Sequence, residues 1–174
     1  EYKSTGNIPK SHLILKNELV SDYIENPIKK IFFKKTKAEI HLSKKNKKLL
    51  LLEGMYSTNG SSYNKFKIQN NLNKKKQNYL IDLNLSENFF FDIINFRSNS
   101  KKISNIKSNF SIGNKKLYFK SIDFKEGKNL ISVKDLVINK KNEIEKISYV
   151  NLLTFDNNIE NNNFKISIGK KISI

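Results

Sequence analysis

The sequence predicts a mainly β fold, built as an antiparallel meander in which each strand pairs with its neighbour along the chain. Apolar and polar residues alternate in one segment after another, most regularly between Ile106 and Ile174. Such alternation gives an extended strand one apolar face and one polar face. Turn-forming pairs such as Gly113-Asn114 separate the segments, and they recur at roughly the 8–14-residue spacing of a sandwich, a barrel or an open sheet.

The N-terminal residues 1–27 are interpreted as a lead-in to the sheet. Between Asn17 and Asn26 apolar residues recur at helical spacing, and Pro27 prevents a helix from continuing. We therefore expect a short helix here and place the antiparallel β-sheet segment at residues 28–174.

Strand patterns fill the chain from residue 28 to residue 85. Alternation and the intervening turns predict strands at residues 31–42, 48–56, 63–69 and 77–85. The four consecutive leucines at 49–52 predict a strand that is buried on both faces. Residues 86–96 break the rhythm, and their apolar residues fit either a bulged strand or a second short helical turn.

The net charge is +17, with 33 basic residues against 16 acidic ones. Only Arg97 is an arginine, although nucleic-acid and phosphate sites favour the bidentate arginine side chain. Lys, Asn and Ile are abundant, as in proteins encoded by AT-rich genomes, so we interpret the charge mainly as solvated surface and do not expect nucleic acid as a partner. Two alternatives stay open: a basic β-domain that binds nucleic acid or another anionic polymer, and a structural β-sandwich without a ligand.

Residues that carry chemistry form no recognisable active site in the sequence. The chain has no cysteine, and its two histidines, His12 and His41, have no partner at metal-ligand spacing. The acidic residues are scattered, and no glycine-rich phosphate loop is present. We expect no enzymatic activity, no metal and no cofactor. No apolar run approaches the ~20 residues of a membrane-spanning helix, and the start at Glu1 leads us to expect a segment of a longer protein.

A distinctive order of features occupies residues 79–174. A strand pattern opens it at 79–85 and an irregular apolar patch follows through Phe96; strand-and-turn units then follow at 106–112, 113–117, 136–138 and 163–168. In this order the features resemble the middle repeats of the AsmA-like family, of the YhdP and TamB type. The resemblance is looser over residues 28–85, and several turns carry Asn or Lys where the family usually has glycine.

The resemblance implies an open, twisted, taco-shaped sheet that forms an apolar groove. It also implies a bridge-like protein of the periplasm, anchored in the inner membrane by parts outside this segment, that supports phospholipid transport between the inner and outer membranes. The partners would be phospholipid acyl chains in the groove, with lysines at its rim near anionic head groups. The residues that we expect on the lipid-groove face are Phe110, Ile112, Phe119, Ile131, Val133, Tyr149, Leu153, Phe164, Ile166 and Ile168.

Overall fold

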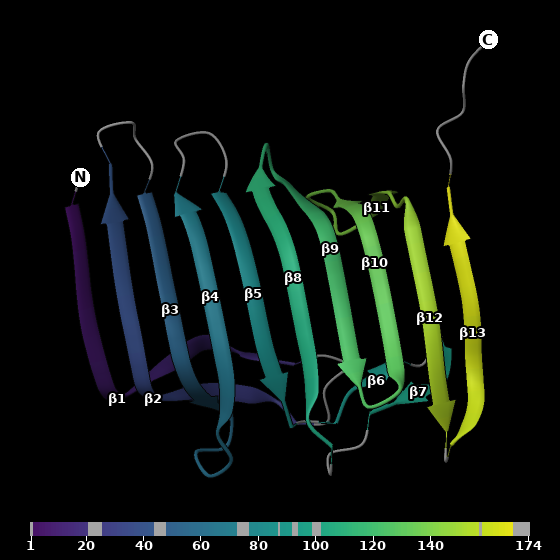
Figure 1. The fold of residues 1–174 in the computed structure, drawn as a ribbon, viewed down its shortest axis with the longest axis horizontal. Coiled ribbons are helices and arrows are strands. Elements are labelled where there is room, and N and C mark those ends of the chain that lie inside the picture. The colour runs from purple at the N-terminus through teal and green to yellow at the C-terminus, as the bar shows by residue number, and fades with distance from the viewer. Residues whose placement is uncertain are drawn as a thin grey trace.

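The computed structural model is almost entirely antiparallel β-structure, arranged as one large open sheet (Figure 1). The predicted fold class is confirmed. The structure describes residues 2–20, 26–43, 48–72, 77–86, 88–91, 94–98, 102–156 and 158–168. Within these ranges, no helix has the length and apolar character needed to cross a membrane.

The strands of the large sheet are β1 (Tyr2–Leu19), β2 (Ile28–Leu42), β3 (Lys48–Ser57), β4 (Asn64–Leu72), β5 (Gln77–Leu85), β8 (Ser104–Gly113), β9 (Lys116–Glu126), β10 (Asn129–Ile138), β11 (Ile144–Lys146), β12 (Tyr149–Asp156) and β13 (Ile159–Ser167). They lie in chain order, each antiparallel to the next, and β11 pairs with β10 beside the main path. β5 and β8 pair directly, and between them the chain leaves the large sheet to form β6 (Phe90–Phe91) and β7 (Phe96–Arg97), which pair with each other. The meander is therefore built almost wholly from neighbours in the chain.

The N-terminal segment differs from the sequence-based expectation. Tyr2–Leu19 forms strand β1, which pairs with β2 from Tyr2 opposite Leu42 to Leu19 opposite Ile28. The expected helix is wrong at residues 17–19, which belong to this strand, and residues 21–25 lie outside the described part of the chain. Pairing with β2 overrides the local helical spacing, because strand propensity depends strongly on the neighbouring strands.

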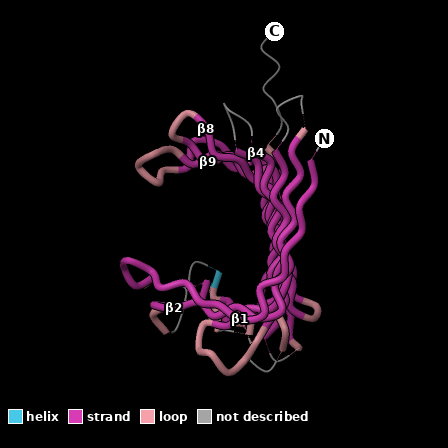
Figure 2. The backbone as a smooth tube through the Cα atoms, turned by 90° about the vertical axis from the view of Figure 1, so that its left-hand side faces the viewer, coloured by secondary structure: helices cyan, strands magenta, loops and turns pink. Residues whose placement is uncertain are grey.

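The large sheet curls so strongly that its profile is C-shaped (Figure 2). Interruptions of the pairing contribute to the bends, because an extra residue in one strand bends it and increases its twist. Lys35 (φ 51°) lies at the register shift between β2 and β3. At the same bulge, an added Cβ on Gly54 would lie 2.8 Å from the Thr36 Cα, so glycine allows the two backbones to approach closely.

The position of the β6–β7 hairpin identifies the concave face of the sheet. The hairpin lies inside the curve of the C (Figures 1 and 2). The Phe91 and Phe96 rings contact the Phe124 ring, with centroid distances of 6.0 and 5.7 Å. Asn162 Nδ2 donates a hydrogen bond of 2.7 Å to the Ile94 carbonyl oxygen. The face that carries Phe124 and Asn162 is therefore the concave one.

Burial is concentrated in two places on this concave face. At the β6–β7 hairpin, Phe96 of β7 and Phe124 of β9 are almost fully buried against each other, and Leu152 of β12 is buried on the same face. Near the β2 bulge, the buried Phe66 ring contacts Phe33 and Tyr56 edge-on. The accessible surface of the whole chain is 12714 Å², whereas a compact protein of this mass would expose about 8,800 Å². The sheet thus leaves much of its surface uncovered.

Candidate functional site

The concave face carries a continuous line of mainly apolar side chains, which we call the apolar row. Strand pairing places one residue of each successive strand of the main path directly opposite the next. Side chains opposite one another in a sheet share a face, so the whole row points to the concave side. The row consists of Gly6, Ala38, Leu52, Ile68, Ile81, Ser108, Ile122, Val133, Val150 and Ile166.

Two further rows flank the apolar row, one on each side, and widen this apolar surface. On one side, pairing aligns Phe66, Leu83, Ile106, Phe124, Ile131, Leu152 and Phe164. On the other side, it aligns Ile40, Leu50, Asn70, Tyr79, Phe110, Phe119 and Leu136. In the second row the Tyr79 and Phe110 rings stack at 5.0 Å between centroids, and Phe119 continues the stack at 5.3 Å.

Among the described residues, most of this surface has no protein layer against it. The β6–β7 hairpin contacts the lower end of the sheet, at Phe124 of β9 and Asn162 of β13. Elsewhere large apolar side chains remain open to solvent: Ile40 is 43 % exposed, Ile112 41 %, Phe164 39 % and Ile166 49 %. A sheet face with this much exposed apolar surface marks an interaction or ligand-binding surface.

The structure brings together eight of the ten residues expected on the groove face. Strand phase puts these eight on the concave side: Phe110, Ile112, Phe119, Ile131, Val133, Phe164, Ile166 and, just beyond β13, Ile168. Tyr149 and Leu153 lie on the convex side, because Val150 and Leu152 between them pair with the concave Ile166 and Phe164. Lys134 and Lys165 lie over the Tyr149 ring instead, at 5.0 and 5.6 Å from its centroid.

The sequence-based set omitted the contribution of β2 to β5. Residues such as Ile40, Leu52 and Ile81 belong to the same concave surface, and the alternation that predicted their strands also indicated their common phase. The leucines at 49–52 are only partly buried, two on each face, so the prediction of a strand buried on both faces is wrong.

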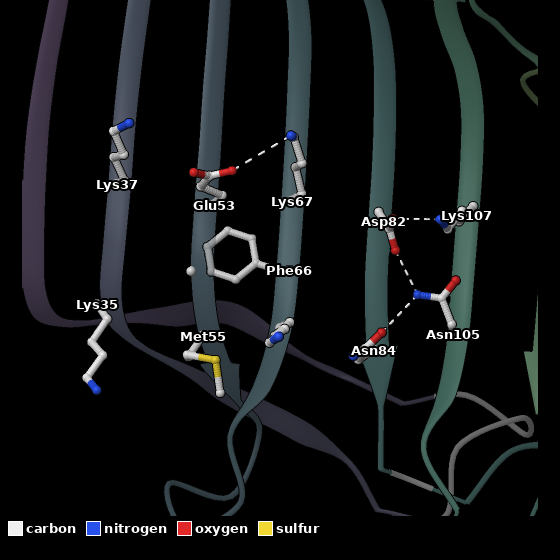
Figure 3. A pocket seen from close by; sticks show the side chains of 12 residues that line it. Lys35, Lys37, Glu53, Met55, Phe66, Lys67, Asp82, Asn84, Asn105 and Lys107 are labelled. Carbon is white, nitrogen blue, oxygen red and sulfur yellow. Dashed lines mark hydrogen bonds and ion pairs between the residues drawn. The ribbon is translucent and has the colours of Figure 1, made fainter.

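The convex face carries a different row directly behind the apolar one, which we call the charge ladder. Its members occupy adjacent strands in register: Lys37, Glu53, Lys67, Asp82, Lys107, Asp123, Ser132, Asn151 and Lys165. Figure 3 shows the first five of these side chains lying along the outer surface of β2 to β8. Positive and negative charges alternate from Lys37 to Asp123.

Direct contacts hold the charge ladder together. Lys67 Nζ lies 3.7 Å from Glu53 Oε2, and Lys107 Nζ lies 3.1 Å from Asp82 Oδ2. Partial burial opposes ionisation of Asp82, but hydrogen bonds from Asn105 and Lys107 outweigh it and hold the pKa of Asp82 below its ordinary value. Lysines paired in this way present little uncompensated positive charge.

A second ion cluster lies at the edge of the convex face, around Glu39. Lys37 Nζ lies 2.7 Å from Glu39 Oε1, and His41 Nε2 and Lys3 Nζ lie 3.3 and 3.6 Å from Oε2. The hydrogen bonds from Lys37 and then His41 lower the pKa of Glu39 to about 2. The same contact raises the pKa of Lys37.

Comparison with known proteins adds no assignment. No family model, no curated protein and no solved structure matches this chain.

Proposed function

We propose that this chain is a segment of a bridge-like periplasmic protein whose concave face shelters phospholipid acyl chains during transport between the inner and outer membranes. The observation that carries the proposal is the apolar row, which continues across the main path of the sheet and, in the part of the chain that the structure describes, has no protein layer over most of its length. The resemblance of residues 79–174 to AsmA-like repeats points to the same function. In the proposed protein, parts outside this segment provide the inner-membrane anchor.

The direction of the apolar row suits a sliding hydrocarbon chain. The row runs across the strands, so an acyl chain lying along it meets an apolar side chain on every strand of the main path except β1, which contributes Gly6, and β8, which contributes Ser108. With strands spaced about 4.8 Å apart, the main path extends over roughly 43 Å. Shielding a methylene group from water is favourable by ~0.8 kcal/mol, and this gain is similar at each step because the row changes little in character from strand to strand.

Apolar and charged side chains also lie on opposite faces of the sheet, as a lipid-binding groove requires. A nucleic-acid surface would combine free cations with aromatic rings on one face. Here the stacked rings of Tyr79, Phe110 and Phe119 lie on the concave side, whereas lysines such as Lys67 and Lys107 lie on the convex side and pair with carboxylates. The arrangement supports an apolar ligand more than an anionic polymer.

Photo-crosslinking tests the proposal directly. A photoreactive amino acid placed at Phe110 or Ile166 should capture phospholipid in cells, because both positions lie on the concave face, Ile166 exposed and Phe110 half-buried. The matched positions are Lys165 and Ser167, which flank Ile166 on the same strand but face the convex side, and they should capture none. Equal capture at both faces, or capture at neither, would contradict the proposal.

A further inference from the structure

A polar pocket lies at the end of the sheet where the β6–β7 hairpin meets two turns. The pocket has a volume of about 410 Å³. It lies between β7, the turn that joins β9 to β10, and the turn that joins β12 to β13. Its lining residues are Arg97, Lys102, Glu126, Gly127, Lys128, Asn129, Phe155, Asp156 and Asn158.

Three cations converge on this pocket without a carboxylate partner. Within the described ranges, no acidic oxygen lies at ion-pair distance from Arg97, Lys102 or Lys128. Arg97 lies over the Phe90 ring at 5.1 Å and Lys128 over the Phe155 ring at 5.9 Å. These three differ from the charge-ladder cations Lys67 and Lys107, which are paired. The lining also holds two carboxylates, Glu126 and Asp156, so three cations against two acids leave the pocket a formal excess of one positive charge.

The turn geometry keeps one side of the pocket open. Gly127 adopts a left-handed backbone (φ +57°), and a Cβ built on it would lie 4.0 Å from Lys102 Nζ. The Lys102 ammonium group therefore lies beside a glycine backbone, with no side chain between them. Exposed backbone and a nearby cation are a combination that admits a bulky anion.

A buried group of hydrogen-bonded side chains also lines the pocket and joins the strands around it. Glu126 is 2 % exposed, and it accepts hydrogen bonds from Ser104 Oγ at 2.7 Å and Asn129 Nδ2 at 3.4 Å. Asn129 Oδ1 in turn accepts a hydrogen bond of 2.8 Å from the Phe155 backbone N–H. These contacts tie β8, β9, β10 and β12 together in the lining that they share with the three cations.

The pocket adjoins the concave face. Phe96, the residue before Arg97, packs against Phe124 in a row that flanks the apolar row. The hairpin covers the concave face at this contact, so a lipid would lay its acyl chains on the open part of that face beside the hairpin and place its head group at this end of the strands. Arginine binds phosphate through two parallel N–H groups, and lysines add charge.

We propose that this pocket binds the phosphate group of a phospholipid whose acyl chains lie on the concave face. The inference rests on the proposed function, because it is the apolar surface that supplies the chains. The sole arginine of the protein then makes the bidentate phosphate contact, and Lys102 and Lys128 neutralise the remaining charge.

Comparing a lipid that has a phosphate group with one that lacks it distinguishes the proposed phosphate site from the proposed acyl-chain groove. The purified chain is offered equal amounts of phosphatidylethanolamine and of diacylglycerol with the same acyl chains in mixed micelles, and bound lipid is counted by native mass spectrometry. We expect a preference of roughly tenfold for the phospholipid, as charge-assisted phosphate contacts give. Binding of both lipids without preference would overturn the phosphate site and leave the acyl-chain groove intact. Binding of neither would overturn the groove itself.

A triple substitution with a charge-matched control assigns the preference to the pocket. R97Q/K102Q/K128Q should bind both lipids about equally, at the level of diacylglycerol. K115Q/K140Q/K141Q removes the same charge from turns at the opposite end of the strands, and it should keep the preference. Equal losses in both variants would mean a general electrostatic effect and would overturn the assignment.

The single arginine also distinguishes a lipid head group from free phosphate. In the lipid-free chain, the Arg97 Nε–H resonance is the only one of its kind. We expect it to shift and saturate with micelles of a short-chain phospholipid at a much lower concentration than with inorganic phosphate. Equal saturation by both probes would mean a free-phosphate site, and no shift with either would overturn the proposal.

Discussion

The convex and concave faces of the large sheet are built by the same strands but differ in how their side chains find partners. On the convex face, Glu53, Lys67, Asp82 and Lys107 stand opposite one another in alternating sign. On the concave face, one sequence neighbour of each belongs to the apolar row that contains Leu52, Ile68 and Ile81, and among the described residues this row has no partner layer over much of its length. The polar face is complete within the chain, whereas the apolar face is not.

The charge ladder explains how this open sheet keeps its strand register although little of the apolar face packs into a core. A slip of one residue would move every charge of the ladder to the concave side, and opposite-charge pairs would be lost. Each cross-strand pair contributes roughly 0.2–1 kcal/mol, so a ladder over successive strands supplies a specific preference for one register. The concave side chains are then available to a ligand, since the convex side specifies the alignment.

The largest expected effect contrasts two positions on adjacent strands of the concave face. Leu152 is 4 % exposed and lies in the region of the β6–β7 hairpin, whereas Ile166 is 49 % exposed. We expect Leu152→Glu to prevent folding, because an unpaired charge would be buried at a cost of several kcal/mol. Ile166→Glu should lower the free energy of unfolding by less than about 1 kcal/mol, because its carboxylate reaches water.

Urea unfolding followed by circular dichroism measures both effects. Ile166→Gln serves as an uncharged control at the open position. If Ile166→Glu were as damaging as Leu152→Glu, the concave face would be a closed core and the contrast between the two parts of that face would fail. Ile166→Glu should still abolish phospholipid capture from Phe110, since the sliding chain would meet an ionised group.

The sequence predicted the fold well because the relevant signal is local. Alternation and turn residues placed the strands from residue 28 onward, and neighbours along the chain do pair. Tyr149 and Leu153 were assigned to the wrong face because β12 contains apolar residues in both phases. Its register with β10 and β13, where Val150 opposes Val133 and Ile166, decides the phase.

Features that depend on distant contacts were not predictable in the same way. Strands β6 and β7 are too short to show a strand pattern, and their position depends on the Phe96–Phe124 contact between separate segments. The charge ladder likewise needs the register of each strand pair. In the pocket, Arg97 comes from β7 and Lys128 from the turn between β9 and β10, and no pattern in the sequence indicates that they line the same site.

A smaller effect is expected at the bend that gives the two faces their opposite curvature. Gly54→Ala should lower the free energy of unfolding by about 1–3 kcal/mol, because the new methyl group would lie 2.8 Å from the Thr36 Cα and the β2 bulge would have to shift. Gly6→Ala is the matched control, because nothing lies within 4 Å of a Cβ there. Chemical denaturation of both variants compares them. Equal stability of the two would show that the close approach at the bulge does not constrain the bend.

The smallest effect concerns the ion cluster at the convex edge. The pKa of Glu39 is lowered from 4.5 to about 2 in the folded protein, through Lys37 first and then His41. Its contribution to stability is therefore fully present above pH 4.5 and is lost as the pH falls toward 2. The difference in melting temperature between the natural chain and Glu39→Gln should be constant at pH 5–7 and shrink below that range.

Added salt tests whether Glu39 stabilises the protein through its charge. Lys37 and Lys3 are 48 % and 57 % exposed, so their attraction to Glu39 is screened by added salt. The difference between the natural chain and Glu39→Gln should decrease in 1 M sodium chloride, a concentration at which the Debye length is about 3 Å. A difference that persists unchanged at pH 2 and at high salt would mean that Glu39 acts through packing and not through its charge. The convex edge would then be held by contacts that do not depend on ionisation, unlike the charge ladder beside it.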